Sequence, residues 1–246
     1  MKPIPPTPSR TEQTYQAILD QICTGALTPG THLVQEQLAA RLGVSRQPIQ
    51  QAMALLKSDG LVQEIGGRGL CVAPLDLDAM RERYEVRAAL DALAARLAAS
   101  RAAAAQEVAR EIGRGGSEII AAGETATAAG DIPRMVERDV AFHRYLYEVS
   151  GNGLVAATAE PHWRYLRRVM GDVLRHAEDG GSIWEQHAEI LDAVVAGNAD
   201  EAAARATAHV ERAARRLSAA LSGQADGREA GVAGNAQPVS GKDADR

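Results

Sequence analysis

Residues 38–62, LAARLGVSRQPIQQAMALLKSDGLV, hold two short amphipathic helical patterns that are separated by one glycine. Leu38 and Leu42 lie on one face of the first pattern, and Gly43 permits a tight turn after it. Ser45 can cap a second helix over residues 46–58, in which apolar residues recur at helical spacing. The stretch therefore predicts two helices joined by a tight turn.

A hairpin is predicted directly after this helix pair. The segments LVQEI (61–65) and LCVA (70–73) have the composition of short strands, and a glycine-rich turn joins them. A hairpin in this place is the wing of a winged helix-turn-helix. We expect this fold for residues 11–75.

The second helix of such a domain can read DNA. A helix of this length fits the major groove, presents its N-terminal side chains to base edges and directs its positive dipole end at phosphate. The residues expected to contact DNA are Arg41, Ser45, Arg46, Gln47 and Gln50, with Arg68 at the tip of the wing. A winged helix that serves only protein contacts is the alternative interpretation.

Composition narrows the class of protein. The chain has 246 residues and a formal net charge of −5, which argues against indiscriminate binding of polyanions by the whole molecule. Cys23 and Cys71 are far apart and outside any metal-type spacing, which indicates a reduced intracellular protein. Because the sequence contains neither a signal-like N-terminus nor a long apolar run, we expect a cytoplasmic protein without a membrane partner.

The chain divides into four expected segments. A Pro-rich arm (1–10) and a tail (223–246) have too few large apolar groups to form a core, so we expect both to be disordered. Pro74 marks the boundary between the winged domain (11–75) and a second domain (76–222), which is rich in alanine, leucine and arginine.

The second domain has the pattern of an all-α antiparallel bundle of about six helices, which makes the protein mainly α. Asp131 with Pro133, and Asn198 with Glu201, are typical of helix starts. The expected breaks between helices are at residues 113–117, 128–131, 150–153, 179–182 and 196–198.

Four polar residues fall on the apolar faces of these predicted helices. Asp139 and His143 are one turn apart in the stripe of residues 132–149, and His187 and His209 lie on two later helices. Each buried polar group without a partner costs roughly 2 kcal/mol or more, and one divalent ion would offset that cost for all four. Three imidazoles and a carboxylate suit Zn, Ni, Mn or Fe. A hydrogen-bonded polar core is the alternative.

Arg87 interrupts the apolar stripe of the first long helix, so its guanidinium is expected to point into the bundle. There it could clamp a small carboxylic acid through two parallel hydrogen bonds. The alternative is a buried salt bridge to Asp139 or Glu85. His162 and His176 stay as candidates for a supporting or surface role.

Two parts of the sequence carry a family resemblance. The opening stretch, followed by GGRGLCV (66–72), resembles the DNA-binding domain of the GntR superfamily of bacterial transcription regulators. YEVRAALDALAARLAASRA (84–102) and the Asp-x-x-x-His motif at 139–143 resemble the FCD effector domain of the FadR-like branch. The resemblance implies a homodimer on a pseudo-palindromic operator, a metal held by the same aspartate and three histidines, and a response to small organic acids.

One position departs from the family pattern. Members of the superfamily usually have an arginine at the position of Gln50, and that arginine is taken to read a guanine. Glutamine favours the N6/N7 edge of adenine instead. We therefore expect an altered base preference at this point of the operator.

Together these features predict a transcription regulator, most simply a repressor, whose affinity for double-stranded operator DNA is controlled by a small carboxylate at a metal site. One alternative is a metal-dependent enzyme, in which the ion activates water. We expect no enzymatic activity, because no separate general base has a convincing location. The other alternative is a metal sensor, in which the ion itself is the signal.

Overall fold

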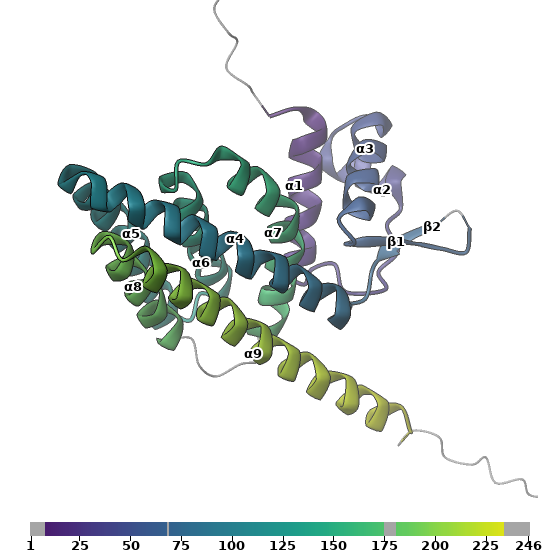
Figure 1. Ribbon diagram of the computed structural model, residues 1–246. Coiled ribbons are helices and arrows are strands. Elements are labelled where there is room, and N and C mark those ends of the chain that lie inside the picture. Colours follow the sequence, from purple (N-terminus) through teal and green to yellow (C-terminus); the bar gives the residue numbers. More distant parts are fainter. Residues whose placement is uncertain (1–7, 68, 175–180, 234–246) are drawn as a thin grey trace, which may run out of the picture.

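The computed structural model describes residues 8–67, 69–174 and 181–233. In its N-terminal part a tight turn at Gly43, with φ +62°, joins the two predicted helices. The two strands pair antiparallel, with Val62 opposite Val72. The winged helix-turn-helix is confirmed (Figure 1), and its elements are α1 (Arg10–Cys23), α2 (Gln35–Leu42), α3 (Arg46–Ser58), β1 (Val62–Ile65) and β2 (Gly69–Val72).

Ser45 lies at the N-cap position of α3, but its side chain makes no capping hydrogen bond. The prediction is therefore correct for the residue at which the helix starts and wrong for the capping hydrogen bond. A capping side chain accepts from the amide of the second or third helical residue, and the third residue here is Pro48, which has no N–H. The Ser45 residue stays exposed at the start of the helix.

The second domain contains six described helices, as predicted, and α4 and α9 run side by side in opposite directions (Figure 1). Its core is continuous with that of the winged domain, because Met80 and Tyr84 of α4 belong to the same apolar cluster as Leu19 of α1 and Met53 of α3. The helices are α4 (Leu77–Ala104), α5 (Gln106–Ala128), α6 (Ile132–Val149), α7 (Gly153–Leu174), α8 (Gly181–Val195) and α9 (Ala199–Ala233).

The break predicted at residues 113–117 is wrong, since α5 runs through it without interruption. Its glycines permit close approach of other helices rather than a turn. A Cβ atom at Gly116 would lie 2.6 Å from Cδ1 of Leu191, and one at Gly123 would lie 2.2 Å from Cη2 of Trp184. Both partners are on α8, so α5 and α8 pack with almost no space between backbone and side chain.

The other helix boundaries mostly follow the prediction. Breaks at 128–131, 150–153 and 196–198 are confirmed, and Asp131 caps α6 by accepting the amide of Arg134 at 3.1 Å. The break expected at 179–182 lies partly outside the described residues. An additional break separates α4 from α5 at Ala105, whose backbone is extended with φ −152°. A run of alanines surrounds it and gives no sequence signal.

The last helix is longer than expected. It continues to Ala233, past residue 223, where we expected a disordered tail to begin. Among the described helices, none combines the length and the apolar character needed to cross a bilayer.

The packing of α5 on α8 predicts opposite effects of two glycine substitutions. Gly123→Ala should lower the free energy of unfolding by about 1–3 kcal/mol, because the added methyl group collides with the Trp184 ring. Gly113→Ala is the control, because its Cβ would meet only Val195, at 3.3 Å. It should be neutral or stabilising by up to about 1 kcal/mol through helix propensity. Thermal unfolding followed by circular dichroism measures both, and an equal gain in Tm for Gly123→Ala would contradict the packing.

Candidate metal centre and nucleic-acid interface

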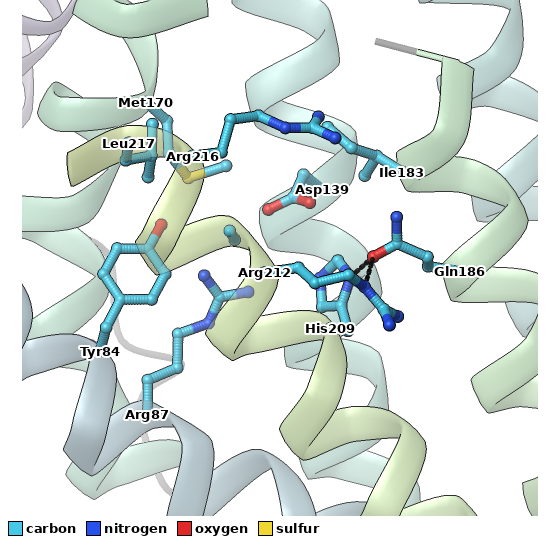
Figure 2. A pocket seen from close by; sticks show the side chains of 11 residues that line it. Tyr84, Arg87, Asp139, Met170, Ile183, Gln186, His209, Arg212, Arg216 and Leu217 are labelled. Atoms are coloured by element: carbon cyan, nitrogen blue, oxygen red, sulfur yellow. Dashed lines mark hydrogen bonds between the residues drawn. The ribbon is translucent and has the colours of Figure 1, made fainter. Parts of the chain in front are cut away.

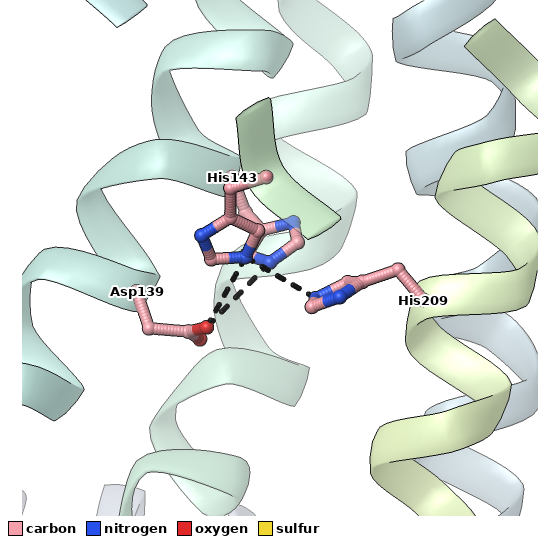
Figure 3. A group of neighbouring side chains, drawn as sticks. Asp139, His143 and His209 are labelled. Atoms are coloured by element: carbon pink, nitrogen blue, oxygen red, sulfur yellow. Dashed lines mark hydrogen bonds and ion pairs between the residues drawn. The ribbon is translucent and has the colours of Figure 1, made fainter. Parts of the chain in front are cut away.

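Asp139 and His143 of α6, His187 of α8 and His209 of α9 converge in the bundle (Figure 3). All four are buried, and one ligand atom from each lies within 4.8 Å of the others. Nε2 of His187 is 3.4 Å from Oδ1 of Asp139 and 3.2 Å from Nε2 of His209, and Nε2 of His143 is 4.0 Å from the same oxygen. Three segments far apart in sequence thus supply one cluster.

These separations fit a single ion. A metal about 2.1 Å from each donor places neighbouring donors roughly 3.0–3.4 Å apart and opposite donors about 4.2 Å apart. The separations of 3.2 and 3.4 Å fall in the range for neighbouring donors, and the separation of 4.0 Å lies near the value for opposite donors. The donor set of three imidazoles and one carboxylate suits a divalent transition metal.

Burial keeps the imidazoles in the form that a metal needs. Loss of solvation lowers the pKa of His143, His187 and His209 well below 6.5, so each ring is neutral near pH 7 and has one nitrogen lone pair. Burial also raises the pKa of Asp139 to about 6, and the Arg87 guanidinium opposes this rise. The site therefore offers neutral nitrogen donors beside a carboxylate that is mostly ionised near pH 7.

Gln186 orients His209 from outside the cluster. Nδ1 of His209 donates to Oε1 of Gln186 at 3.1 Å, and the same oxygen accepts from Nε of Arg212 at 3.1 Å (Figure 2). Because Nδ1 carries the proton, the lone pair of Nε2 faces His187. Orientation of a ligand histidine by a hydrogen bond to its other nitrogen is typical of metal sites.

Arg87 does point into the bundle, with an exposure of 2%. The buried salt bridge that we considered is present, but with Asp91, at 3.3 Å, and not with Asp139 or Glu85. The guanidinium also donates from Nη2 to Nε2 of His143 at 2.7 Å.

Asp91 and Tyr147 belong to the site and were missed in the sequence. Asp91 is fully buried, lies 3.0 Å from Nδ1 of His143 without hydrogen-bond geometry, and accepts a hydrogen bond from the Tyr147 hydroxyl. The signal for Asp91 was present, because it follows Arg87 by four residues and Tyr84 by seven on one helical stripe. Tyr147 gave none, since a buried tyrosine is ordinary in a core.

A cavity of about 50 Å³ adjoins the cluster (Figure 2). Two buried oxygens of its lining residues, the Tyr84 hydroxyl and Oδ2 of Asp139, have no hydrogen-bond partner within the protein. Polar atoms are rarely left unsatisfied at such depth, so their clustering indicates space for a ligand. Other lining residues are the cations Arg87, Arg212 and Arg216 and the apolar Met170, Ile183, Ala213 and Leu217.

The remaining histidine candidates lie apart from this cluster. His162 is half-buried on α7 and is not among the four converging residues. His176 lies outside the described residues.

Five of the six predicted DNA-contacting residues lie in α2, in α3 or in the turn between them. Arg41, Ser45, Arg46, Gln47 and Gln50 are all exposed, and Arg68 lies outside the described residues. In the free protein the Arg46 guanidinium pairs with Glu36 of α2.

Two residues beside this surface were not predicted from the sequence. Arg10 and Thr11 of α1 line a hollow together with Ser45 and Gln47 at the start of α3. Their position after a proline-rich arm gave no indication of this contact.

Comparisons with known proteins agree with both domains. Residues 10–72 match the family described as bacterial regulatory proteins, gntR family, and residues 82–212 match the FCD domain. An uncharacterised HTH-type transcriptional regulator in an unstable DNA locus of Streptomyces ambofaciens is 32% identical over 190 residues, which cover 75% of this chain and 75% of that protein. The HTH-type transcriptional repressor RspR of Escherichia coli (strain K12) is 26% identical over 206 residues, covering 84% and 88%.

A solved structure shares the fold. That of E. coli McbR/YncC has a TM-score of 0.71 at 19% identity and covers 85% of this chain and 97% of that chain. The family matches together span most of the described residues and agree with the FadR-like resemblance. The chain therefore belongs to the GntR family of bacterial regulatory proteins and is a DNA-binding transcription regulator with an FCD effector-binding domain, not an enzyme.

Proposed function

We propose that this regulator binds its operator with an affinity controlled by a small carboxylate, which occupies the cavity beside a metal ion. The main support for the proposal is that four buried metal-type donors lie next to a cavity whose lining contains unpartnered polar atoms. A metal sensor requires the four donors but does not require a cavity for an organic molecule. The cavity therefore favours an organic effector over the ion as the signal.

Asp139, His143, His187 and His209 would hold the metal, a divalent ion such as Zn, Ni, Mn or Fe. Four protein donors leave two positions of an octahedral ion open, or one if both oxygens of Asp139 bind, and the ion would supply a positive charge and a coordination site for a carboxylate oxygen. Arg87 and the Tyr84 hydroxyl face the same cavity and can donate hydrogen bonds to an acid.

Charge and shape define the effector class. Three arginines line the cavity, so an anion is favoured, and the walls formed by Met170, Ile183 and Leu217 are apolar. A volume of about 50 Å³ restricts the occupant to a small molecule. A small carboxylic acid with few further polar groups meets these requirements.

On DNA, α3 would enter the major groove, with Arg46, Gln47 and Gln50 toward base edges and Arg41 and Ser45 toward the backbone. One such helix reads only a few base pairs, so the protein acts as a homodimer on a pseudo-palindromic operator. We propose repression as its mode of action, in line with the name of its relative RspR.

Metal binding is expected to be stoichiometric and to stabilise the fold. Metal-free protein titrated with Zn²⁺ should bind one ion per chain, and an ion at a hundredfold excess over its Kd adds about 2.7 kcal/mol to the free energy of unfolding. His187→Ala should abolish both the binding and the rise in Tm. Elemental analysis and thermal unfolding measure the two effects.

His162→Ala is the matched control, because it removes a half-buried histidine of α7 that lies outside the cluster. It should bind zinc as the unmodified chain does. Undiminished zinc binding by His187→Ala would overturn the proposed site.

Tyr84→Phe is expected to separate stability from ligand binding. Removal of a buried, unpartnered hydroxyl should leave the stability of the free protein unchanged or raise it by about 1 kcal/mol. It should weaken the acid selected in a thermal-shift screen of short-chain carboxylates by roughly tenfold, the worth of a hydrogen bond to a charged group. Chemical unfolding and calorimetric titration measure the two quantities.

Tyr145→Phe serves as the control, because the Tyr145 hydroxyl already bonds the carbonyls of Glu111 and Ile112, at 3.2 and 3.0 Å. It should lose stability and bind the acid normally. Equal acid affinity in Tyr84→Phe and the unmodified protein would remove Tyr84 from the effector site.

Gln50→Arg should change which base the operator prefers. Arginine donates two hydrogen bonds to O6 and N7 of guanine, whereas glutamine pairs with N6 and N7 of adenine, and each such pairing discriminates by about 1–3 kcal/mol. Selection from random duplexes with both proteins should therefore exchange adenine for guanine at one position in each half-site. An identical base profile for the two proteins would show that Gln50 does not read a base.

A further inference from the structure

Helix α7 contacts the candidate metal centre through Trp163. The buried indole lies against Arg87, whose Cζ is 4.0 Å from the ring centroid, and its centroid is 5.2 Å from that of His143. Its Nε1 donates to the Tyr147 hydroxyl at 3.1 Å, and Tyr147 donates in turn to Asp91. Trp163 therefore touches the groups that orient both Arg87 and His143.

The same helix also contacts the DNA-binding domain, beginning with the residue that follows Trp163. Arg164 lies 3.5 Å from Oδ2 of Asp59, the C-cap residue of α3, and its Cζ is 5.1 Å from the ring centroid of Tyr15. The Tyr15 hydroxyl donates to the same carboxylate at 2.6 Å. Arg167 pairs with Asp20 of α1 at 3.4 Å. The end of the DNA-reading helix is thus fixed to α7.

Two further residues of α7 form hydrogen bonds with the backbone of the segment that connects the domains. The Tyr165 hydroxyl accepts a hydrogen bond from the backbone N–H of Asp76 at 3.1 Å and donates one to the backbone carbonyl of Asp76 at 3.0 Å. Arg168 donates a hydrogen bond to the backbone carbonyl of Ala73. Pro161 lies inside α7, two residues before Trp163, and its missing N–H removes one backbone hydrogen bond of the helix.

His143 gives the site two exclusive arrangements. Nε2 of the neutral ring accepts the hydrogen bond from Arg87, so this nitrogen carries the lone pair and Nδ1 carries the proton. One lone pair serves either the guanidinium or a metal ion. An ion held by His143 therefore requires Arg87 to leave its present position against Trp163.

We infer that α7 carries the state of this site to the DNA-reading helix, with Trp163 as the contact to Arg87 and Arg164 as the contact to the end of α3. The inference rests on the proposed function. The two-state element is the Arg87–His143 hydrogen bond, which is either present or broken in favour of a metal ion. The two states bias α7 differently and thereby change operator affinity.

The test uses the full chain, operator DNA recovered by selection from random duplexes, and Zn²⁺ as the probe. The ratio of operator Kd values in metal-free and zinc-loaded protein measures the coupling, which in allosteric proteins is typically about 5–150-fold. Arg164→Gln should bring this ratio to less than about twofold while zinc stoichiometry stays unchanged. Arg164 is partly exposed, with a side-chain exposure of 34%, so the substitution leaves the core intact.

Arg205→Gln is the matched control. Arg205 joins α9 to Glu189 of α8 at 2.8 Å, a contact that involves neither α7 nor the DNA-binding domain, and its side-chain exposure of 39% is similar to that of Arg164. It should retain the full ratio. Asp59→Asn should reduce the ratio as Arg164→Gln does, and the double variant should add nothing further, as expected for partners in one contact.

A full ratio in Arg164→Gln would overturn the inference and leave the proposed function standing. The same holds if the unmodified protein binds zinc without any change in operator Kd. If the unmodified protein binds no zinc, the proposed metal site fails as well.

A second measurement examines the Trp163 contact directly. The chain contains two tryptophans, so Trp184→Phe leaves Trp163 as the only one. Its fluorescence should change on addition of Zn²⁺, with the same Kd as zinc binding. Constant emission throughout the titration would contradict movement of Arg87 against the indole.

Discussion

The arrangement of the second domain depends on one constraint: charged and polar groups buried in a helical bundle must satisfy one another. The protein meets this constraint in part. Arg87 pairs with Asp91 and bonds His143, and His209 bonds Gln186. Oδ2 of Asp139 and Nδ1 of His187 nevertheless lack partners. The atoms that converge within the cluster, Oδ1 of Asp139 and Nε2 of the three histidines, are donors suited to a bound ion, and the rest of the domain serves to hold them in place.

The bundle positions this cluster through close packing. Gly116 and Gly123 let α8 approach α5, which fixes the helix that carries His187. The hydrogen-bonded side chains of Tyr147 and Trp163 fix α6 against α7. Because the site donors come from three helices, small shifts between these helices change the distances among the donors. The same packing therefore links the site to the movement of helices on which regulation depends.

Much of this could be predicted from the sequence, and the exceptions have physical reasons. Asp139, His143, His187 and His209 were found because helical periodicity reports which side chains face inward. The partner of Arg87 was mistaken, because periodicity gives a face and not a contact. The glycines of α5 were read as a turn, since local composition does not distinguish a bend from a close approach. Contacts between domains, such as Arg164 with Asp59, leave no local pattern at all.

We propose that four side chains from three helices hold one ion. X-ray absorption spectroscopy of the zinc-loaded protein examines the site itself, because the fine structure identifies the atoms around the metal. We expect a first shell at about 2.0–2.2 Å with imidazole scattering from three histidines and at least one further oxygen. A shell containing sulfur, or one of oxygen atoms without imidazole, would contradict it.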